Sequence, residues 1–216
     1  MKLGIFGGTF NPPHFGHLRT AEEVRDAACL DMVIFMPSGN PPMKTSGLAE
    51  AAHRYEMVRR AVLNNKGFTV SDMEVRQSEI SYTVTTLLSL REQYPEDELF
   101  FILGMDAFLD MPNWRQPERL VELSDFIVVT RPGVQPEEMA MSPFVAPHSR
   151  SAQADPDKYT LVSGRRAALV RVTPLDISST AVRTMVGQGK SIRYLLPEAV
   201  EEYIHEHRLY YTPSSA

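Results

Sequence analysis

Short apolar runs alternate with longer segments of helical periodicity along most of the chain, and this alternation constrains the fold more than any other feature. The run at 99–103 is apolar at every position, as expected of a strand covered on both faces. The predicted strands are 3–6, 32–36, 68–70, 99–103, 126–130 and 168–172, and the predicted helices are 16–28, 51–63, 83–93, 179–187 and 197–207. This pattern predicts an α/β fold, a doubly wound parallel sheet with helices on both faces.

One segment interrupts the alternation. Residues 134–166 are rich in proline, serine and alanine, show no clear periodicity, and are long for a loop. A chain of 216 residues fits one domain of ordinary size. We therefore predict a single domain over residues 1–216, in which 134–166 is a mobile insertion that could close as a lid.

The composition excludes some classes of protein. A net charge of −5 argues against a protein that coats nucleic acid through bulk positive charge, although it allows a basic cluster around one small phosphorylated ligand. No apolar run is long enough to span a membrane, and the first residues do not resemble a signal peptide, so we expect a cytoplasmic protein. The single cysteine, Cys29, cannot form an intramolecular disulfide and is expected to be buried.

The most informative motif joins the first predicted strand to the first predicted helix. Residues 7–17 read Gly-Gly-Thr-Phe-Asn-Pro-Pro-His-Phe-Gly-His. Adjacent glycines let a backbone approach a ligand closely, and a helix start offers N–H groups and the positive end of a dipole to an anion. His14 and His17 stand three residues apart there, so both imidazoles can point toward one bound phosphate chain.

Other interpretations of these histidines are possible. As metal ligands they lack a cysteine or carboxylate cluster to complete a zinc set, and as surface or capping residues they would need no glycine pair. Neither the dinucleotide fingerprint G-x-G-x-x-G nor the Walker pattern is present. The glycine pair and its place between strand and helix favour phosphate binding.

A second candidate phosphate site opens the helix after the last predicted strand. Ser178 and Ser179 are suitable N-cap residues, and no glutamate or glutamine follows to form a capping box. Arg183 lies four residues beyond Ser179, on the same helix face. Hydroxyls, backbone N–H groups and a guanidinium can converge on phosphate there. A capped helix with a solvated arginine remains the alternative.

The two motifs together resemble a known superfamily. His-x-Gly-His resembles the signature of the nucleotidyltransferases, and Ile-Ser-Ser-Thr resembles their second signature. Over nearly its whole length the chain is similar to the bacterial nicotinate mononucleotide adenylyltransferases. Further matching segments are Ser81-Tyr82-Thr83, Gly104-Met105-Asp106 with Trp114, Arg131-Pro132-Gly133, and the tail at 195–210. The resemblance implies a Rossmann-like domain with a small C-terminal helical part.

It also implies an activity and roles for residues. Such enzymes join ATP to nicotinate mononucleotide, with Mg²⁺, and release deamido-NAD and pyrophosphate. The implied catalytic residues are His14, His17 and Arg183; those implied to bind ATP are Gly8, Thr9, Phe10, Gly104, Asp106, Ser179 and Thr180; and those implied to bind nicotinate are Thr83 and Trp114.

The chain departs from the family pattern at one place. The family shows Pro-Pro-His-Lys after the second strand, whereas here the residues are Pro41-Pro42-Met43-Lys44. Met43 cannot donate a hydrogen bond to phosphate. Lys44 remains a candidate for binding the mononucleotide phosphate, beside the alternative of a solvated loop lysine.

Other functions share these motifs. A phosphopantetheine adenylyltransferase or a cytidylyltransferase would use the same two phosphate sites. A non-catalytic nucleotide sensor is a further alternative, although a binder gains little from donors aimed at a developing charge. The sequence does not decide between nicotinate and nicotinamide mononucleotide as the substrate. It also does not show whether the protein forms a homo-oligomer.

Overall fold

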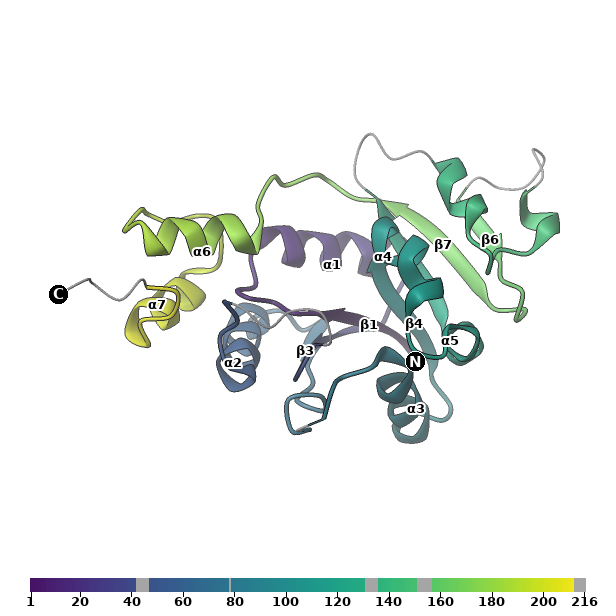
Figure 1. Cartoon of the computed structure of the whole chain (residues 1–216), viewed down its shortest axis with the longest axis horizontal. Coiled ribbons are helices and arrows are strands. Elements are labelled where there is room, and N and C mark those ends of the chain that lie inside the picture. Colours follow the sequence, from purple (N-terminus) through teal and green to yellow (C-terminus); the bar gives the residue numbers. More distant parts are fainter. Residues whose placement is uncertain (42–46, 78, 131–135, 151–156, 212–216) are drawn as a thin grey trace. The chain divides into compact units, whose positions relative to one another are not determined.

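The computed structural model describes residues 1–41, 47–77, 79–130, 136–150 and 157–211 (Figure 1). Its contacts divide the chain into two compact units, each assembled from separate stretches of sequence. Unit 1 comprises Met1–Gly7, Thr20–Ile34 and Tyr82–Pro174, and unit 2 comprises Gly8–Arg19, Phe35–Ser81 and Leu175–Ala216. The stretches interleave, so neither unit is a contiguous domain, and one domain over 1–216 stays a prediction.

The strands form one seven-stranded sheet in the order β3-β2-β1-β4-β5-β7-β6. Their bounds are β1 Lys2–Gly8, β2 Met32–Pro37, β3 Phe68–Val70, β4 Glu98–Gly104, β5 Asp125–Thr130, β6 Lys158–Thr160 and β7 Arg166–Arg171. The pairs β1–β4, β4–β5 and β5–β7 are parallel, and β6 runs antiparallel to β7. The predicted doubly wound parallel sheet is confirmed, with β6 as an antiparallel edge strand that the sequence did not predict. The strand order reverses between β1 and β4, and in such sheets ligands bind beyond the carboxyl ends of the strands at this point.

The helices agree closely with the sequence pattern. Their bounds are α1 Phe15–Ala27, α2 Ala51–Val62, α3 Thr83–Gln93, α4 Met105–Asp110, α5 Pro117–Leu123, α6 Ser179–Gly187 and α7 Glu198–Glu206, with a short 3-10 helix η1 at Met111–Asn113. The long helices lie within one residue of their predicted bounds. The sequence did not predict the short α4 and α5.

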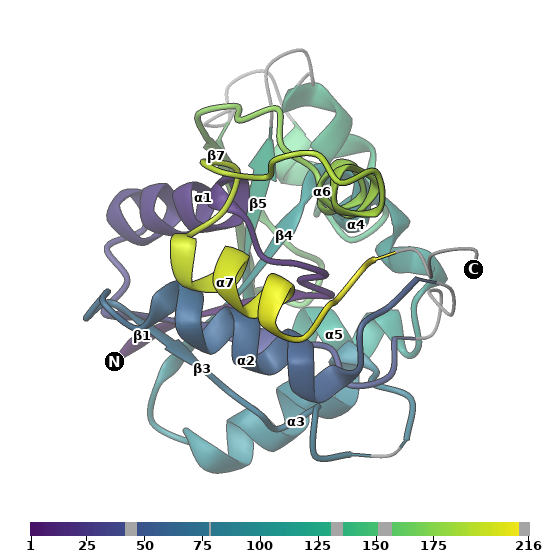
Figure 2. The same cartoon turned by 90° about the vertical axis from the view of Figure 1, so that its left-hand side faces the viewer.

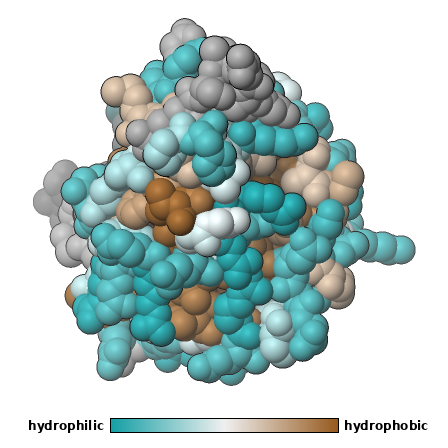
Figure 3. Space-filling model, turned by 90° about the vertical axis from the view of Figure 1, so that its right-hand side faces the viewer, coloured by the Kyte–Doolittle hydropathy of each residue, from teal (hydrophilic) through white to brown (hydrophobic). Residues whose placement is uncertain are grey.

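Part of the predicted insertion is packed structure within unit 1. It contains the 3-10 helices η2 (Pro136–Met141) and η3 (Pro147–Arg150), and β6 pairs with β7. Met139, Val145 and Leu161 are buried. Figure 3, which looks from this side, shows apolar groups as separate spots on a largely hydrophilic surface, as is usual for folded proteins. A lid function stays a prediction.

The prediction for Cys29 is wrong, because its side chain is exposed. Helix α1 ends at Ala27, and Cys29 has a φ of 50°, in the left-handed region. The turn directs the next residue, Leu30, into the core, where it is 3% exposed.

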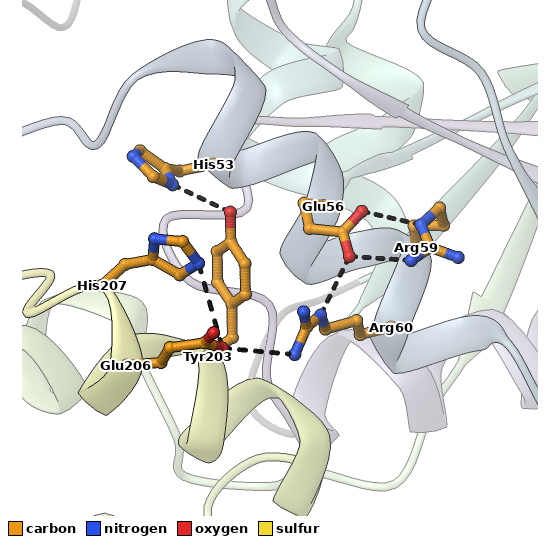
Figure 4. A network of polar contacts seen from close by, with 7 residues as sticks. All are labelled: His53, Glu56, Arg59, Arg60, Tyr203, Glu206 and His207. Atoms are coloured by element: carbon orange, nitrogen blue, oxygen red, sulfur yellow. Dashed lines mark hydrogen bonds and ion pairs between the residues drawn. The ribbon is translucent and has the colours of Figure 1, made fainter.

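Helices α2, α6 and α7 build the core of unit 2. Their buried side chains form one apolar cluster: Met57, Val182, Val186, Ile192, Leu196, Val200, Tyr203 and Ile204. Helix α7 lies along α2, as Figure 2 shows. A polar network borders this contact (Figure 4): His53 Nδ1 and the Tyr203 hydroxyl are 2.9 Å apart, and the Arg60 guanidinium lies over the Tyr203 ring at 4.5 Å. The network helps to fix α7 and the tail that follows it.

Glu56, one of the carboxylates of this network, gives a testable pH dependence. Hydrogen bonds from Arg59, and then from Arg60, lower the pKa of Glu56 from 4.5 to about 2. Because the pKa of Glu56 is lower in the folded protein than in the unfolded chain, its ionised carboxylate stabilises the fold at pH values above 4.5. This stabilisation is lost as the pH falls from 4.5 toward 2. Because both arginines are partly exposed, solvent screens their interaction with Glu56, and we assign these contacts about 1 kcal/mol of folding stability.

Replacing Glu56 by glutamine is therefore expected to lower the melting temperature at pH 7 by about 2–4 °C. Thermal unfolding followed by circular dichroism at pH 7 and near pH 2 checks this, since the difference should disappear in acid. Glu202→Gln, at an exposed position of α7, is the matched control and should leave the melting temperature unchanged. Equal melting temperatures for Glu56→Gln and the parent at pH 7 would contradict the assignment.

Candidate active site

The loop 8–17, which we call the histidine loop, carries both histidines into the start of α1. The His14 backbone N–H donates to Nδ1 of His17 at 3.2 Å, and the two imidazole centroids are 3.8 Å apart. Because Nδ1 of His17 accepts this bond, its other ring nitrogen, Nε2, carries the hydrogen. The backbone of the loop thus selects the tautomer in which Nε2 of His17 is a donor.

Two glycines allow this geometry. A Cβ on Gly16 would lie 2.9 Å from Cε1 and Nδ1 of His14, so the residue between the histidines must be small for the buried imidazole to keep its place. A Cβ on Gly8 would lie 3.0 Å from the ring of Phe10. Phe10 itself is 2% exposed and meets the His17 ring edge-on at 5.1 Å. A side chain at position 16 would thus displace the His14 ring, and one at position 8 would crowd the Phe10 ring.

The start of α6 contacts the same loop, within unit 2. Ser178 is the N-cap, and its hydroxyl accepts from the Ala181 N–H. The Ser179 hydroxyl donates to the Pro12 carbonyl at 2.8 Å. The structure thus brings together the two helix starts that the sequence singled out.

Arg183 also reaches the histidine loop. Its Nη1 donates to the Asn11 carbonyl at 2.8 Å, and its Nη2 lies 3.3 Å from the Thr180 hydroxyl. The side chain is half-buried and bonded, not solvated. Ser179 and Arg183, which the sequence suggested as ligands, therefore also bind backbone carbonyls of the loop.

Asn11 is a residue whose role the sequence did not show. It is 3% exposed, and its Nδ2 donates to the Gly47 carbonyl at 2.9 Å. Its Oδ1 accepts from the Ala49 N–H and, at 2.7 Å, from the Tyr210 hydroxyl. Burial raises the pKa of Tyr210, which keeps this hydroxyl protonated as a donor. The C-terminal tail thus helps to fix the histidine loop.

Arg54 is a second residue that sequence reasoning missed. It lies on α2, only 1% of it is exposed, and its guanidinium bonds backbone carbonyls around the histidine loop, Thr9 among them. An arginine on an amphipathic helix is normally solvated, so no local signal marks it.

Gly104 and Asp106 lie in unit 1, at the carboxyl end of β4. Gly104 is the N-cap of α4, and a Cβ built on it would meet no atom within 4 Å. Asp106 is exposed in the first turn of α4. Both residues therefore present open surface at the place where the fold class binds ligands.

Thr83 and Trp114 belong to segments that meet in unit 1. Thr83 is the first residue of α3, directly after Tyr82, and the Arg115 guanidinium lies over the Tyr82 ring at 4.6 Å. Trp114 is half-buried and donates from Nε1 to Asp110 at 3.1 Å. This bond fixes the orientation of the indole.

The candidate Lys44, and Met43 before it, lie outside the described residues. In the described part of the chain, no group of three or more His, Cys, Asp or Glu side chains is arranged to hold a metal ion. None of the described helices has the length and apolar character needed to cross a membrane.

Comparisons with known proteins show the family to which the chain is similar. The family model described as cytidylyltransferase-like matches residues 5–185. A probable nicotinate-nucleotide adenylyltransferase of Geotalea daltonii is 45% identical over 212 residues, which cover 97% of this chain and 98% of that protein. Another, of Citrifermentans bemidjiense, is 48% identical over 213 residues, with 97% and 98% covered.

Among solved structures, a Plasmodium falciparum nicotinic acid mononucleotide adenylyltransferase complexed with NaAD has a similar fold. The TM-score is 0.75 at 20% sequence identity, and the match covers 97% of each chain.

Proposed function

The chain belongs to the cytidylyltransferase-like family and to the nicotinate-nucleotide adenylyltransferases, and we propose that it transfers the adenylyl group of ATP to nicotinate mononucleotide. The products are deamido-NAD and pyrophosphate. The observation that carries the proposal is the meeting of two helix starts, those of α1 and α6, at the histidine loop. Each start presents a positive dipole end to a polyphosphate, although at α1 the N–H groups of Phe15 and His17 already donate to the carbonyls of Leu195 and His14.

We propose direct in-line attack. A phosphate oxygen of nicotinate mononucleotide forms a bond to the α-phosphorus of ATP, and the bond from that phosphorus to the bridging oxygen of pyrophosphate breaks. Both reactants are anions, so alignment and charge stabilisation are the main requirements. His17 Nε2 would donate to the α-phosphate, and His14 would act on the α- and β-phosphates. No covalent intermediate on the protein is needed.

The start of α6 would hold the departing pyrophosphate. Arg183 supplies a fixed positive charge, Ser179 and Thr180 supply backbone N–H groups, and Thr180 also supplies its hydroxyl. The bonds from Arg183 and Ser179 to the histidine loop fix the distance between the donors on the two helices. Such preorganised donors lower the barrier because they need not reorient as charge develops.

Magnesium is proposed to enter with ATP. Mg²⁺ usually keeps several waters and binds substrate phosphates, with few ligands from the protein. When bound, Mg²⁺ neutralises charge on the phosphates. Because ATP and pyridine nucleotides are cytoplasmic metabolites, we propose that the protein acts in the cytoplasm.

We also propose partners for the remaining parts of the substrates. We propose that Asp106 accepts hydrogen bonds from ribose hydroxyls above Gly104. Thr83 and Trp114 are proposed to contact the nicotinate ring, with the indole stacked on it. Gly8, Thr9 and Phe10 are proposed to bind ATP through backbone groups, and Lys44 to bind the phosphate of the mononucleotide.

Gly104→Ala tests the ribose assignment. The added methyl meets no protein atom and the backbone φ is −73°, so the melting temperature should not change. If a ligand approaches this backbone closely, the KM for ATP or for the mononucleotide should rise about tenfold or more. Steady-state kinetics checks this, and parent KM values for both substrates would exclude a close approach at Gly104.

Pyrophosphate release from ATP tests the proposed reaction itself. The purified chain is assayed with nicotinate mononucleotide, nicotinamide mononucleotide and phosphopantetheine in parallel. We expect rapid release with nicotinate mononucleotide and formation of deamido-NAD. Release with phosphopantetheine alone would favour the other adenylyltransferase, and ATP binding without release would indicate a nucleotide sensor.

A further inference from the structure

Arg54 is the largest of the fully buried side chains in the described part of the chain. Its guanidinium donates from Nε to the Ala49 carbonyl at 3.0 Å and from Nη2 to the Gly39 carbonyl at 2.8 Å. Nη1 donates to the carbonyls of Thr9, at 3.0 Å, and Ser38, at 2.5 Å. One side chain thus joins the histidine loop to the end of β2 and to the start of α2.

All of these partners are neutral carbonyls. Among the described residues Arg54 forms no ion pair, so its positive charge is buried without a bonded counter-charge. Burial lowers the pKa of the guanidinium, and the nearby Tyr210 and Glu74 oppose this effect, but an arginine in a protein stays protonated. Burying a charge without an ion-pair partner is unfavourable for folding. Unfavourable local features of this kind are expected at functional sites.

The bond to Thr9 has a specific consequence for the loop. A trans peptide is planar, so the Thr9 carbonyl and the Phe10 N–H point in opposite directions. By holding the carbonyl, Arg54 orients the peptide that carries the Phe10 N–H. Phe10 in turn packs against the ring of His17. A change at Arg54 is therefore transmitted through two residues to the imidazole that faces the phosphates in the proposed reaction.

We propose that Arg54 is a positioning residue for adenylyl transfer, which holds the histidine loop in its active geometry and places a fixed positive charge behind it for the polyphosphate of ATP. This inference rests on the proposed function, because it takes ATP as the ligand of the loop. Arg54 does not touch the substrate in this proposal. It acts through the Thr9 peptide and through its charge.

Two variants separate the two contributions. Arg54→Lys keeps the charge but cannot bond all four carbonyls, so we expect kcat to fall by about 10²-fold while the KM for ATP changes less. Arg54→Met removes the charge as well and should also raise the KM for ATP above that of the lysine variant. Val62→Ala, two turns further along α2 at a buried apolar position, is the stability control and should keep the parent kcat. All kinetics are measured at temperatures where each protein is folded.

A lysine variant with the parent kcat would overturn the inference. So would a Val62→Ala protein that loses kcat to the same extent at a comparable melting temperature, since the effect would then be one of stability. If the parent releases no pyrophosphate with any acceptor, the proposed function fails, and the rise in melting temperature on adding ATP tests Arg54 separately. A smaller rise in Arg54→Met than in Arg54→Lys supports the inference, and equal rises contradict it.

Discussion

Replacing His17 by alanine is expected to lower kcat by about 10²–10³-fold, because one preorganised donor to the developing charge is lost. The fold should tolerate the change, since His17 is only partly buried and lies in the first turn of α1. Pyrophosphate release under saturating ATP and nicotinate mononucleotide measures the effect. A His17→Ala protein with the parent kcat would exclude His17 from the reaction.

Two further substitutions test which ring nitrogen matters. The amide of glutamine can place an N–H near the position of Nε2, whereas the shorter asparagine reaches only the position of Nδ1. Because Nδ1 accepts from the His14 N–H, Nε2 is the donor that should face phosphate. His17→Gln should therefore retain more activity than His17→Asn. The reverse order would show that the role of His17 lies in its bond to the loop backbone.

The sequence predicted the sheet and the long helices because their patterns are local and extended. The strand bounds agree within two residues and the long-helix bounds within one. Helix α5, by contrast, has seven residues, too few for a clear period, and begins after Gln116 in a left-handed conformation. Strand β6 has three residues and joins the sheet by pairing with β7. Short elements of this kind depend on tertiary contacts, which periodicity does not contain.

The same distinction applies to the site. His14 and His17 could be identified because their spacing and neighbouring glycines are contiguous in sequence. Tyr210 could not, because its partner Asn11 is 199 residues away, and Arg54 could not, because its partner Thr9 is 45 residues away. The sequence indicated groups that can bind phosphate, but the supporting bonds beneath them are visible only in three dimensions.

Gly39→Ala is expected to have the largest effect on stability. A Cβ at Gly39 would lie 2.0 Å from the carbonyl oxygen of Glu74 and 2.8 Å from its carbonyl carbon. These are backbone atoms, so no side-chain rotation relieves the overlap. The neighbouring segment is also fixed, because Asn40 and Ser81 exchange hydrogen bonds in both directions, at 3.0 and 3.3 Å. We expect a loss of about 3 kcal/mol or more, and a melting temperature lower by about 6–12 °C.

Thermal unfolding of Gly39→Ala beside Gly104→Ala makes the comparison sharp. The same methyl group is added at both positions, but one meets a backbone carbonyl and the other meets no protein atom. The Gly39 carbonyl also accepts from Arg54, so the displaced backbone should disturb the histidine loop and lower kcat in the folded fraction of the protein. If Gly39→Ala were as stable as the parent, the segments at 39 and 74 would separate readily. The Gly39 carbonyl would then not be a fixed acceptor for Arg54, and Arg54 could not hold the Thr9 carbonyl in one position.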